Sequence, residues 1–173
     1  MDLKDKALRV KLLLLDVDGV FTDGKLYYTS QGEEIKVFHV RDGLGIKLAQ
    51  RAGIRVGVIS GRKSQALLKR LEELQIEEIH LGHNQKLPLL EDLLKRLSLD
   101  FEEIAFVGDD YVDLPILKRV GFPVVVKDAP EELKKHALYI TKAKGGEGAV
   151  REVVELLLTL RDQWEEIIKD YYA

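Results

Sequence analysis

Two aspartates separated by one residue follow the most apolar segment of the chain. Asp16 and Asp18 come directly after four consecutive leucines at residues 12–15. In an extended backbone the side chains of residues i and i+2 point the same way, with their Cα atoms about 6–7 Å apart. Two carboxylates that converge in this way repel one another unless a cation joins them or one stays protonated. Capping of the next turn would account for one of these acids but poorly for both.

The residue types around this pair favour Mg²⁺ as the joining cation. Carboxylate oxygens without a neighbouring histidine or cysteine suit a hard ion, Mg²⁺ before Zn²⁺, and the chain contains no cysteine. An EF-hand calcium loop shares the Asp-x-Asp-Gly spacing, but it needs a third ligand before its glycine and a glutamate at position twelve. The segment therefore predicts a magnesium site.

A second group of acids follows another apolar segment. Residues 104–107 lead, after one glycine, into Asp109, Asp110 and Asp113. Asp109 stands at the end of a predicted strand, as Asp16 does, and a shared metal accounts for both positions. Asp113 by itself is typical of a helix N-cap.

Two further segments are suited to binding anions. Ser60, Gly61 and Arg62 lie between a predicted strand and a predicted helix, where free backbone N–H groups attract negative charge. Ser60 alone would also be typical of a simple helix start. Lys86 begins another predicted helix, where a cation opposes the helix dipole and a purely structural lysine is unusual.

The elements that must position these residues alternate along the chain. Short apolar runs predict strands at residues 11–15, 55–59, 78–81, 104–107, 123–126 and 138–140. Amphipathic patterns predict helices at residues 43–52, 63–74, 86–97, 113–120 and 131–136. This alternation predicts an α/β fold, a three-layer Rossmann-like parallel sheet with helices on both faces. Ligands of such sheets bind beyond the carboxyl ends of the strands, which is where the polar residues gather.

Residues 24–40 interrupt the alternation. Two extended runs, 25–29 and 34–40, surround a turn at residues 30–32. They predict a β-hairpin, a flap over about residues 24–41, inserted after the first strand and projecting over the ligand crevice. An edge hairpin that only packs is the alternative.

The C-terminal segment, residues 145–173, differs again. After a glycine-rich break at residues 145–148, apolar residues recur at helical spacing from Val150 to Ile168 and predict one amphipathic helix. Its aromatic end, with Trp164, Tyr171 and Tyr172, is typical of a docking surface for another subunit.

Composition limits the function classes. The 173 residues suffice for a single domain, and 46% hydrophobic with 33% charged residues is typical of a soluble globular chain. A net charge of −3 gives no reason to expect a nucleic-acid or membrane-surface partner. No apolar run reaches the 18 or so residues of a membrane span, and the charged N-terminus lacks a signal-peptide core. We therefore expect a cytoplasmic protein.

Taken in order, these motifs resemble those of the haloacid dehalogenase superfamily of phosphotransferases, over nearly the whole chain. The matching set is Asp16-x-Asp18-Gly19-Val20-x-Thr22-Asp23, Ser60, Lys86 and Gly108-Asp109-Asp110-x-x-Asp113. Within it, residues 16–20, 32–34, 38–43 and 145–152 are similar to the 3-deoxy-D-manno-octulosonate 8-phosphate phosphatases. The resemblance implies a fold without a separate cap domain, so that residues 1–173 form one phosphatase domain, and a homotetramer.

The resemblance also implies roles for the acids and their neighbours. Asp16 would be the nucleophile and a Mg²⁺ ligand, and Asp18 would be the acid and base, touching substrate and reaching the metal through its carbonyl. Asp109 would complete the protein ligands of the metal, and Asp110 or Asp113 would hold water bound to the metal. Ser60 and Lys86 would bind the phosphoryl oxygens, because an anionic nucleophile meets a phosphate only where cations neutralise the charge.

For the sugar, the resemblance points to His39, Lys47, Arg62 and Arg70, together with Asp18 and Lys86. Cationic side chains suit a substrate with a carboxylate and a phosphate. The alternative is a solvated helix face for Lys47 and Arg70, and an ordinary hairpin position for His39. Glu147 departs from the family pattern, in which an arginine usually stands between the glycines.

The implied activity is Mg²⁺-dependent hydrolysis of 3-deoxy-D-manno-octulosonate 8-phosphate through an aspartyl-phosphate, in lipopolysaccharide precursor synthesis. A nine-carbon ulosonic acid 9-phosphate is the alternative substrate. A receiver-like phospho-accepting domain and a non-catalytic scaffold are the alternatives from other classes. Asp18 argues against the receiver, because a second carboxylate indicates turnover. In the tetramer, the hairpin and the tail after Lys144 from neighbouring subunits are expected to close the site.

Overall fold

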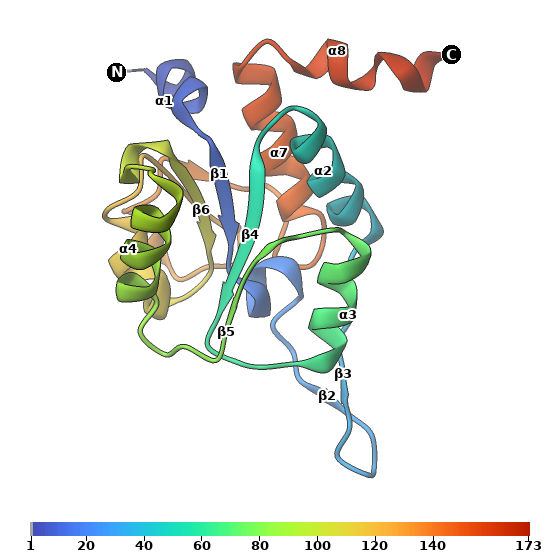
Figure 1. Cartoon of the computed structure of the whole chain (residues 1–173). Helices are drawn as coiled ribbons and strands as arrows, with labels where there is room; N and C mark the ends of the chain where they lie inside the picture. The colour runs from blue at the N-terminus through green and yellow to red at the C-terminus, as the bar shows by residue number, and fades with distance from the viewer. Residues whose placement is uncertain (1) are drawn as a thin grey trace.

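A computed structural model of the chain describes residues 2–173. Its centre is a six-stranded, fully parallel sheet in the order β5-β4-β1-β6-β7-β8 (Figure 1). The strands are β1 Leu12–Leu15, β4 Arg55–Ser60, β5 Glu78–Leu81, β6 Ile104–Gly108, β7 Phe122–Val125 and β8 Tyr139–Ile140. The predicted parallel α/β sheet is confirmed, and each of its strands lies at a predicted position.

Helices cover both faces of the sheet. Helices α2, α3 and α7 lie on one side and α4 on the other, which makes three layers (Figure 1). The helices are α1 Leu3–Arg9, α2 Val40–Arg51, α3 Gln65–Glu73, α4 Lys86–Leu97, α5 Leu114–Leu117, α6 Glu131–Lys134, α7 Ala149–Leu160 and α8 Trp164–Ile168. Short helical turns are η1 Val17–Phe21, η2 Phe101–Glu103, η3 Tyr111–Asp113 and η4 Lys169–Tyr172. Among residues 2–173 no separate cap domain is present.

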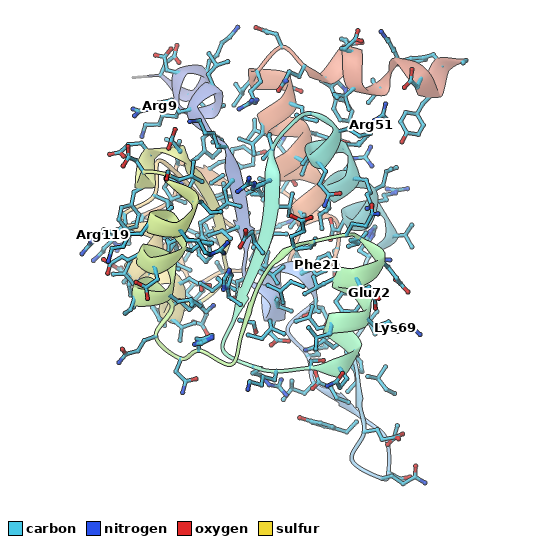
Figure 2. All side chains as sticks on the ribbon, in the orientation of Figure 1. Arg9, Phe21, Arg51, Lys69, Glu72 and Arg119 are labelled. Atoms are coloured by element: carbon cyan, nitrogen blue, oxygen red, sulfur yellow. The ribbon has the colours of Figure 1, made fainter. Side chains whose placement is uncertain are left out.

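The apolar strands form the core that fixes the sheet. All four leucines of β1 have no exposed surface, since β1 is paired on both sides and covered on both faces. In Figure 2, Phe21 lies inside the molecule, whereas Lys69 and Glu72 lie on the outer surface of α3. Leu15 pairs with Val58 of β4 and with Val107 of β6, so these strands end at the same edge. Polar residues that follow them must therefore meet.

The inserted hairpin is smaller than predicted. Only β2 Tyr27–Tyr28 and β3 Glu34–Ile35 are paired, antiparallel, instead of the two longer runs. A two-stranded ribbon without a third strand is marginal. Helix α2 begins at Val40, earlier than predicted, because the His39 Nδ1 accepts from the Arg41 N–H and caps it. The glycines within α2 hid this start, since glycine disfavours a helix interior.

Two helical segments differ from the sequence prediction at the ends of the chain. Helix α1 was not predicted, although Asp2 and Asp5 form a capping box at its start. The single C-terminal helix is divided into α7, α8 and η4, with Asp162 at φ 57° in the break. The apolar spacing continues through this break, so the pattern alone did not reveal it.

Helix α8 lies at the end of the molecule opposite the hairpin (Figure 1). The Arg51 guanidinium of α2 donates to Asp170 over 2.7 Å, and Arg151 of α7 lies over the Trp164 ring at 5.8 Å. Trp164 therefore packs on its own chain, whereas Tyr171 and Tyr172 are exposed. Within the described residues no helix has the length and apolarity that crossing a membrane requires.

Candidate active site

The turn after β1 directs its two aspartates apart. Asp16 is still extended, and the helical turn η1 follows it, with Gly19 at φ 94°. A Cβ on Gly19 would lie 1.8 Å from Asp109 Oδ2, so both the backbone conformation and the close approach require glycine. This turn places the Asp16 carboxylate toward the end of β6 and the Asp18 carboxylate toward the hairpin.

Three carboxylates from two strand ends meet at the sheet edge. Oxygens of Asp16, Asp109 and Asp113 lie within 4.8 Å of one another. Asp113 is fully buried, and its Oδ2 accepts from the Asp109 N–H over 3.0 Å. Its carboxylate does not cap α5. Asp113 thus belongs to the carboxylate cluster, although its position alone suggested only a helix N-cap. The Asp110 carboxylate accepts from the Tyr111 N–H instead.

Lys86 is the cation of this cluster. Its Nζ donates to Asp16 Oδ1 and to Asp113 Oδ1, both over 2.7 Å, and its side chain is 4% exposed. Burial alone would lower the pKa of the Lys86 ammonium, but Asp16 and Asp113 raise it above its ordinary value. Lys86 therefore stays charged beside Asp16.

One ammonium does not balance the charge of these three carboxylates, of which Asp16 and Asp113 are buried and Asp109 is half-buried. Burial, with the charge of Asp113, raises the pKa of Asp16 to about 6. Burial, with the hydrogen bond and charge of Asp16, raises the pKa of Asp109 to about 9. Crowded carboxylate oxygens with excess negative charge fit a divalent cation, and an all-oxygen set fits Mg²⁺. Among residues 2–173 this is the one group of three or more acids or histidines close enough to hold a metal.

Ser60 and Arg62 line the same cavity as the acids. This cavity of about 450 Å³ is also lined by Asp16, Asp18, Lys86 and Asp109. Ser60, at the end of β4, is buried, and its Oγ accepts from the Arg62 N–H over 3.2 Å. The Arg62 guanidinium donates to the Tyr28 hydroxyl over 3.3 Å. The structure therefore gathers the predicted nucleophile, acid, cations and hydroxyl around one space.

The other predicted sugar-binding residues lie elsewhere in this chain. His39 faces a second cavity of about 260 Å³ together with Glu147 and Arg151. The Lys47 Nζ donates to the Leu74 carbonyl oxygen over 2.7 Å at the end of α3. Arg70 is paired with Glu73 at 3.2 Å and packs against Gly43 of α2. Of the four cationic candidates, Arg62 is the one that lines the carboxylate cavity.

Lys36, which sequence reasoning missed, contacts the site. Its Nζ donates to Asp18 Oδ1 over 2.6 Å and lies 2.7 Å from Glu34 Oε1. Burial would lower the pKa of Lys36, but the hydrogen bonds to Asp18 and Glu34 outweigh it and raise the pKa. A lone lysine in a predicted edge strand gave no signal of this contact.

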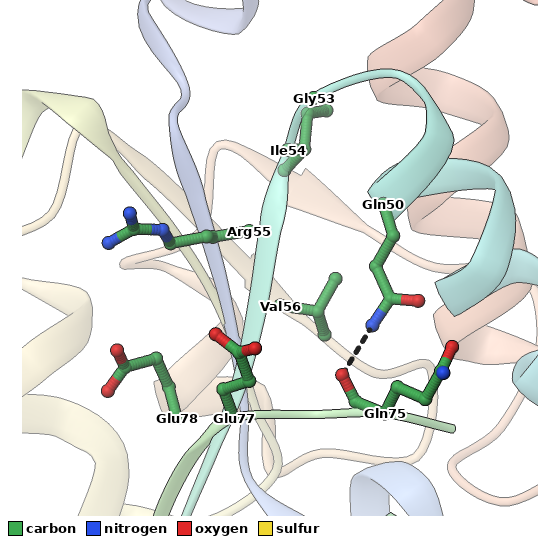
Figure 3. Close-up of a pocket in the computed structure, with 8 residues that line it drawn as sticks. All are labelled: Gln50, Gly53, Ile54, Arg55, Val56, Gln75, Glu77 and Glu78. Carbon is green, nitrogen blue, oxygen red and sulfur yellow. Dashed lines mark hydrogen bonds between the residues drawn. The ribbon is translucent and has the colours of Figure 1, made fainter. Parts of the chain in front are cut away.

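A larger cavity lies at the opposite end of the sheet. It has a volume of about 530 Å³ and lies where β4 and β5 begin, with Gln50, Arg55, Gln75 and Glu77 among its lining residues (Figure 3). The Gln50 amide donates to the Gln75 carbonyl over 3.3 Å, and Glu78 is paired with Arg96. Among residues 2–173 the one group of acids or histidines that could hold a metal lies in the carboxylate cavity and not here.

The glycine pair before α7, Gly145 and Gly146, packs against the turn η1. A Cβ on Gly145 would lie 1.6 Å from the Gly19 oxygen, and a Cβ on Gly146 would lie 2.3 Å from the Asp23 nitrogen. The Gly146 N–H donates to the Val20 carbonyl over 3.0 Å. The start of the C-terminal segment is therefore packed against the turn of its own chain, and the helices beyond lead away from the site.

Comparison with known proteins agrees with this geometry. Residues 78–153 match the model of the haloacid dehalogenase-like hydrolase family. The chain is 44% identical over 165 residues to the 3-deoxy-D-manno-octulosonate 8-phosphate phosphatase KdsC of Escherichia coli (strain K12), covering 95% of this chain and 88% of that protein.

Solved structures are also similar. A probable YrbI family phosphatase from Pseudomonas syringae pv. phaseolica superposes with a TM-score of 0.96 at 41% identity, covering 98% of this chain and 97% of that one. The Moraxella catarrhalis 3-deoxy-D-manno-octulosonate 8-phosphate phosphatase, in complex with magnesium, phosphate and KDO, gives 0.94 at 38% identity, covering 97% of each chain. This chain therefore belongs to the 3-deoxy-D-manno-octulosonate 8-phosphate phosphatases, within the haloacid dehalogenase-like hydrolases.

Proposed function

We propose that this chain is a Mg²⁺-dependent phosphatase that hydrolyses 3-deoxy-D-manno-octulosonate 8-phosphate to the free sugar acid and phosphate. The observation that carries the proposal is the buried Asp16 carboxylate, bonded to Lys86 and adjacent to Asp109 at the mouth of the sheet. Residues 1–173 act as one catalytic unit. The reaction belongs to the cytoplasm, in the synthesis of lipopolysaccharide precursors.

The acids divide into those that hold the metal and those that orient them. Asp16 and Asp109 would bind Mg²⁺ through their carboxylates, and Asp18 through its backbone carbonyl. Asp113 fixes the Asp109 backbone and Lys86, and Asp110 lies next to them. The bound cation would neutralise charge on the phosphate and on Asp16.

The first chemical step transfers the phosphoryl group to Asp16. A carboxylate oxygen of Asp16 attacks phosphorus, and the bond from phosphorus to the sugar oxygen breaks. The Asp18 carboxyl gives its proton to that oxygen, so a neutral alcohol leaves. Lys86 and the Ser60 hydroxyl neutralise and orient the transferring oxygens.

The second step returns the enzyme to its starting state. Water attacks the phosphorus of the aspartyl-phosphate, and Asp18, now ionised, takes a proton from that water. The bond between phosphorus and the Asp16 oxygen breaks, which releases inorganic phosphate and regenerates the Asp16 carboxylate. Both steps use Asp18, which distinguishes turnover from the storage of a phosphoryl group.

We further propose that the protein is a homotetramer. The hairpin exposes Leu26, Tyr28, Ile35 and Val37, and Val40 at the start of α2 is 80% exposed. Apolar side chains gathered on a projecting element favour burial against another subunit. In such an assembly, His39, Lys47 and Arg70 of one subunit would help to bind the substrate of a neighbouring subunit. Light scattering is expected to give four times the chain mass, and an active monomer would contradict this.

A comparison of kcat/KM for two substrates tests the size of the sugar acid that the site accepts. We expect kcat/KM for 3-deoxy-D-manno-octulosonate 8-phosphate to exceed that for a nine-carbon ulosonic acid 9-phosphate by at least about tenfold, because an extra carbon displaces the carboxylate from its cations. Equal values, or a preference for the nine-carbon acid, would contradict the assignment.

A further inference from the structure

Lys36 is a buried cation beside the carboxylate cavity, and the two chemical steps proposed above do not use it. The Lys36 side chain, just after β3, is 4% exposed. Its Nζ lies 2.6 Å from Asp18 Oδ1 and 2.7 Å from Glu34 Oε1. Burial of an ammonium is unfavourable unless it is paired, and here both partners are carboxylates. The enclosure of Lys36 therefore indicates a specific role for this ion pair.

The contact makes the two oxygens of Asp18 different. Oδ1 accepts from Lys36, which leaves Oδ2 to exchange a proton with the substrate. The Asp18 side chain is 24% exposed, so without a partner its carboxylate would rotate in water. Proton transfer in both steps requires one oxygen to stay directed at the reacting group.

Lys36 is itself held from its far side. Glu34 Oε2 lies 3.5 Å from the Arg62 guanidinium, which also donates to the Tyr28 hydroxyl. A chain of alternating charges thus runs from Asp18 through Lys36 and Glu34 to Arg62. It joins the hairpin to the catalytic turn and to the segment after β4, so the hairpin helps to fix the geometry of Asp18.

We propose that Lys36 is a positioning residue that fixes the Asp18 carboxyl for proton transfer, an inference that rests on the proposed phosphatase function. When Asp16 attacks and the bond from phosphorus to the alcohol oxygen breaks, the proton on Asp18 Oδ2 passes to that oxygen. Loss of the Lys36 ammonium leaves the nucleophile and the phosphate-binding groups in place, but the proton donor loses its orientation.

The test compares two substrates that differ in their need for this proton. A sugar alkoxide leaves poorly unless it is protonated, whereas p-nitrophenolate leaves without help, and kcat/KM covers the steps up to this departure. For Lys36→Met we expect kcat/KM for the sugar phosphate to fall by about 10- to 100-fold, through kcat and not KM. For p-nitrophenyl phosphate we expect a fall below about threefold. The ratio of the two does not depend on the folded fraction of the preparation.

Two further variants make the result specific. Lys25→Met, on the same hairpin with a 75% exposed side chain, is the matched control and should leave both substrates unchanged. Lys36→Arg keeps the cation and should recover part of the lost rate. An equal fall on both substrates, or a change in KM alone, would overturn the proposal.

Failure of the proposed function is distinguishable from failure of this inference. Wild-type protein that does not hydrolyse the sugar phosphate would refute the function. The comparison would then use the alkyl phosphate that the wild type hydrolyses fastest, against p-nitrophenyl phosphate. A selective loss on that alkyl phosphate would still support the role of Lys36, and a uniform loss would refute it.

Discussion

Lys86 supports both the charge balance and the stability of the site. It is the ammonium that separates two buried carboxylates, Asp16 and Asp113, and it is itself buried. Removal of one partner of a buried ion pair leaves an uncompensated charge, which is more destabilising than the pair is stabilising. The same residue faces the cavity in which phosphate would bind. We therefore expect both activity and folding to depend on the contacts of Lys86 with Asp16 and Asp113.

For Lys86→Met we expect the metal-free protein to lose about 3–5 kcal/mol of unfolding free energy. Urea unfolding at pH 7 measures this loss. Lys95→Met, which removes an 80% exposed partner of Asp92, is the control and should change stability little. A loss for Lys86→Met no larger than that of the control would mean that the cluster does not depend on this ammonium.

Among the single residues of the site, the sequence predicted those that stand at the carboxyl ends of strands. Asp16, Ser60 and Asp109 each follow an apolar run, and parallel strands bring such residues to one edge, where the structure places them. Lys36 was missed because its contact with Asp18 depends on how the hairpin folds back. The contact of Lys47 with the Leu74 carbonyl was also not predictable, because helical spacing does not indicate which neighbouring element a side chain contacts.

The turn η1 and the glycine pair before α7 act as one structural unit. Backbone atoms of residues 19–23 lie so close to Gly145 and Gly146 that no side chain fits between them. The turn η1 is thus packed against a segment more than a hundred residues away in the sequence. A disturbance of the glycine pair should reach Asp16 and Asp18 through this contact.

We expect Gly146→Ala to reduce both stability and turnover, and Gly148→Ala to be milder. Both glycines have positive φ, 74° and 104°, so both variants carry backbone strain. A Cβ at Gly146 would lie 2.3 Å from the Asp23 nitrogen, whereas a Cβ at Gly148 meets nothing within 4 Å. The additional loss at Gly146 should be about 1–3 kcal/mol, the usual effect of overpacking, and thermal unfolding measures it. Equal losses would show that strain alone matters.

Elements with long, regular patterns were predicted from sequence, and those set by local contacts were not. The sheet and its crossover helices follow from apolar runs and amphipathic spacing. The early start of α2 depends on a His39 cap, and its glycines allow Arg70 and Arg151 to approach. The break before α8 is fixed by Arg161, which donates to the carbonyls of Ala7 and Val10. Neither feature has a periodic signature.

The acid cluster makes the unfolding free energy of the whole molecule depend on pH. The raised pKa values of Asp16 and Asp109 mean that the folded state holds protons more tightly than the unfolded chain. A folded state that binds more protons loses stability as the pH rises above the unfolded pKa. The loss accumulates from about pH 4 toward the folded values, about 6 for Asp16 and about 9 for Asp109.

Metal-free protein is therefore expected to become less stable by about 2 kcal/mol or more between pH 5 and pH 8. Saturating Mg²⁺ should remove most of this loss, because the cation replaces the protons between the carboxylates. Urea unfolding with a chelator or with Mg²⁺ measures both effects, and Asp16→Asn should show a weaker pH dependence. If the metal-free protein instead became more stable from pH 5 to pH 8, repulsion between the ionised carboxylates of the cluster would not be destabilising, which contradicts this prediction.

The most direct test of the whole account is phosphate release from 3-deoxy-D-manno-octulosonate 8-phosphate, with and without Mg²⁺, by wild-type protein and by Asp16→Asn. We expect turnover that needs the metal and that falls by at least about a thousandfold in the variant, since the nucleophile is lost. Turnover that continues in Asp16→Asn, or folded wild-type protein that binds Mg²⁺ and releases no phosphate, would contradict the assignment of this site.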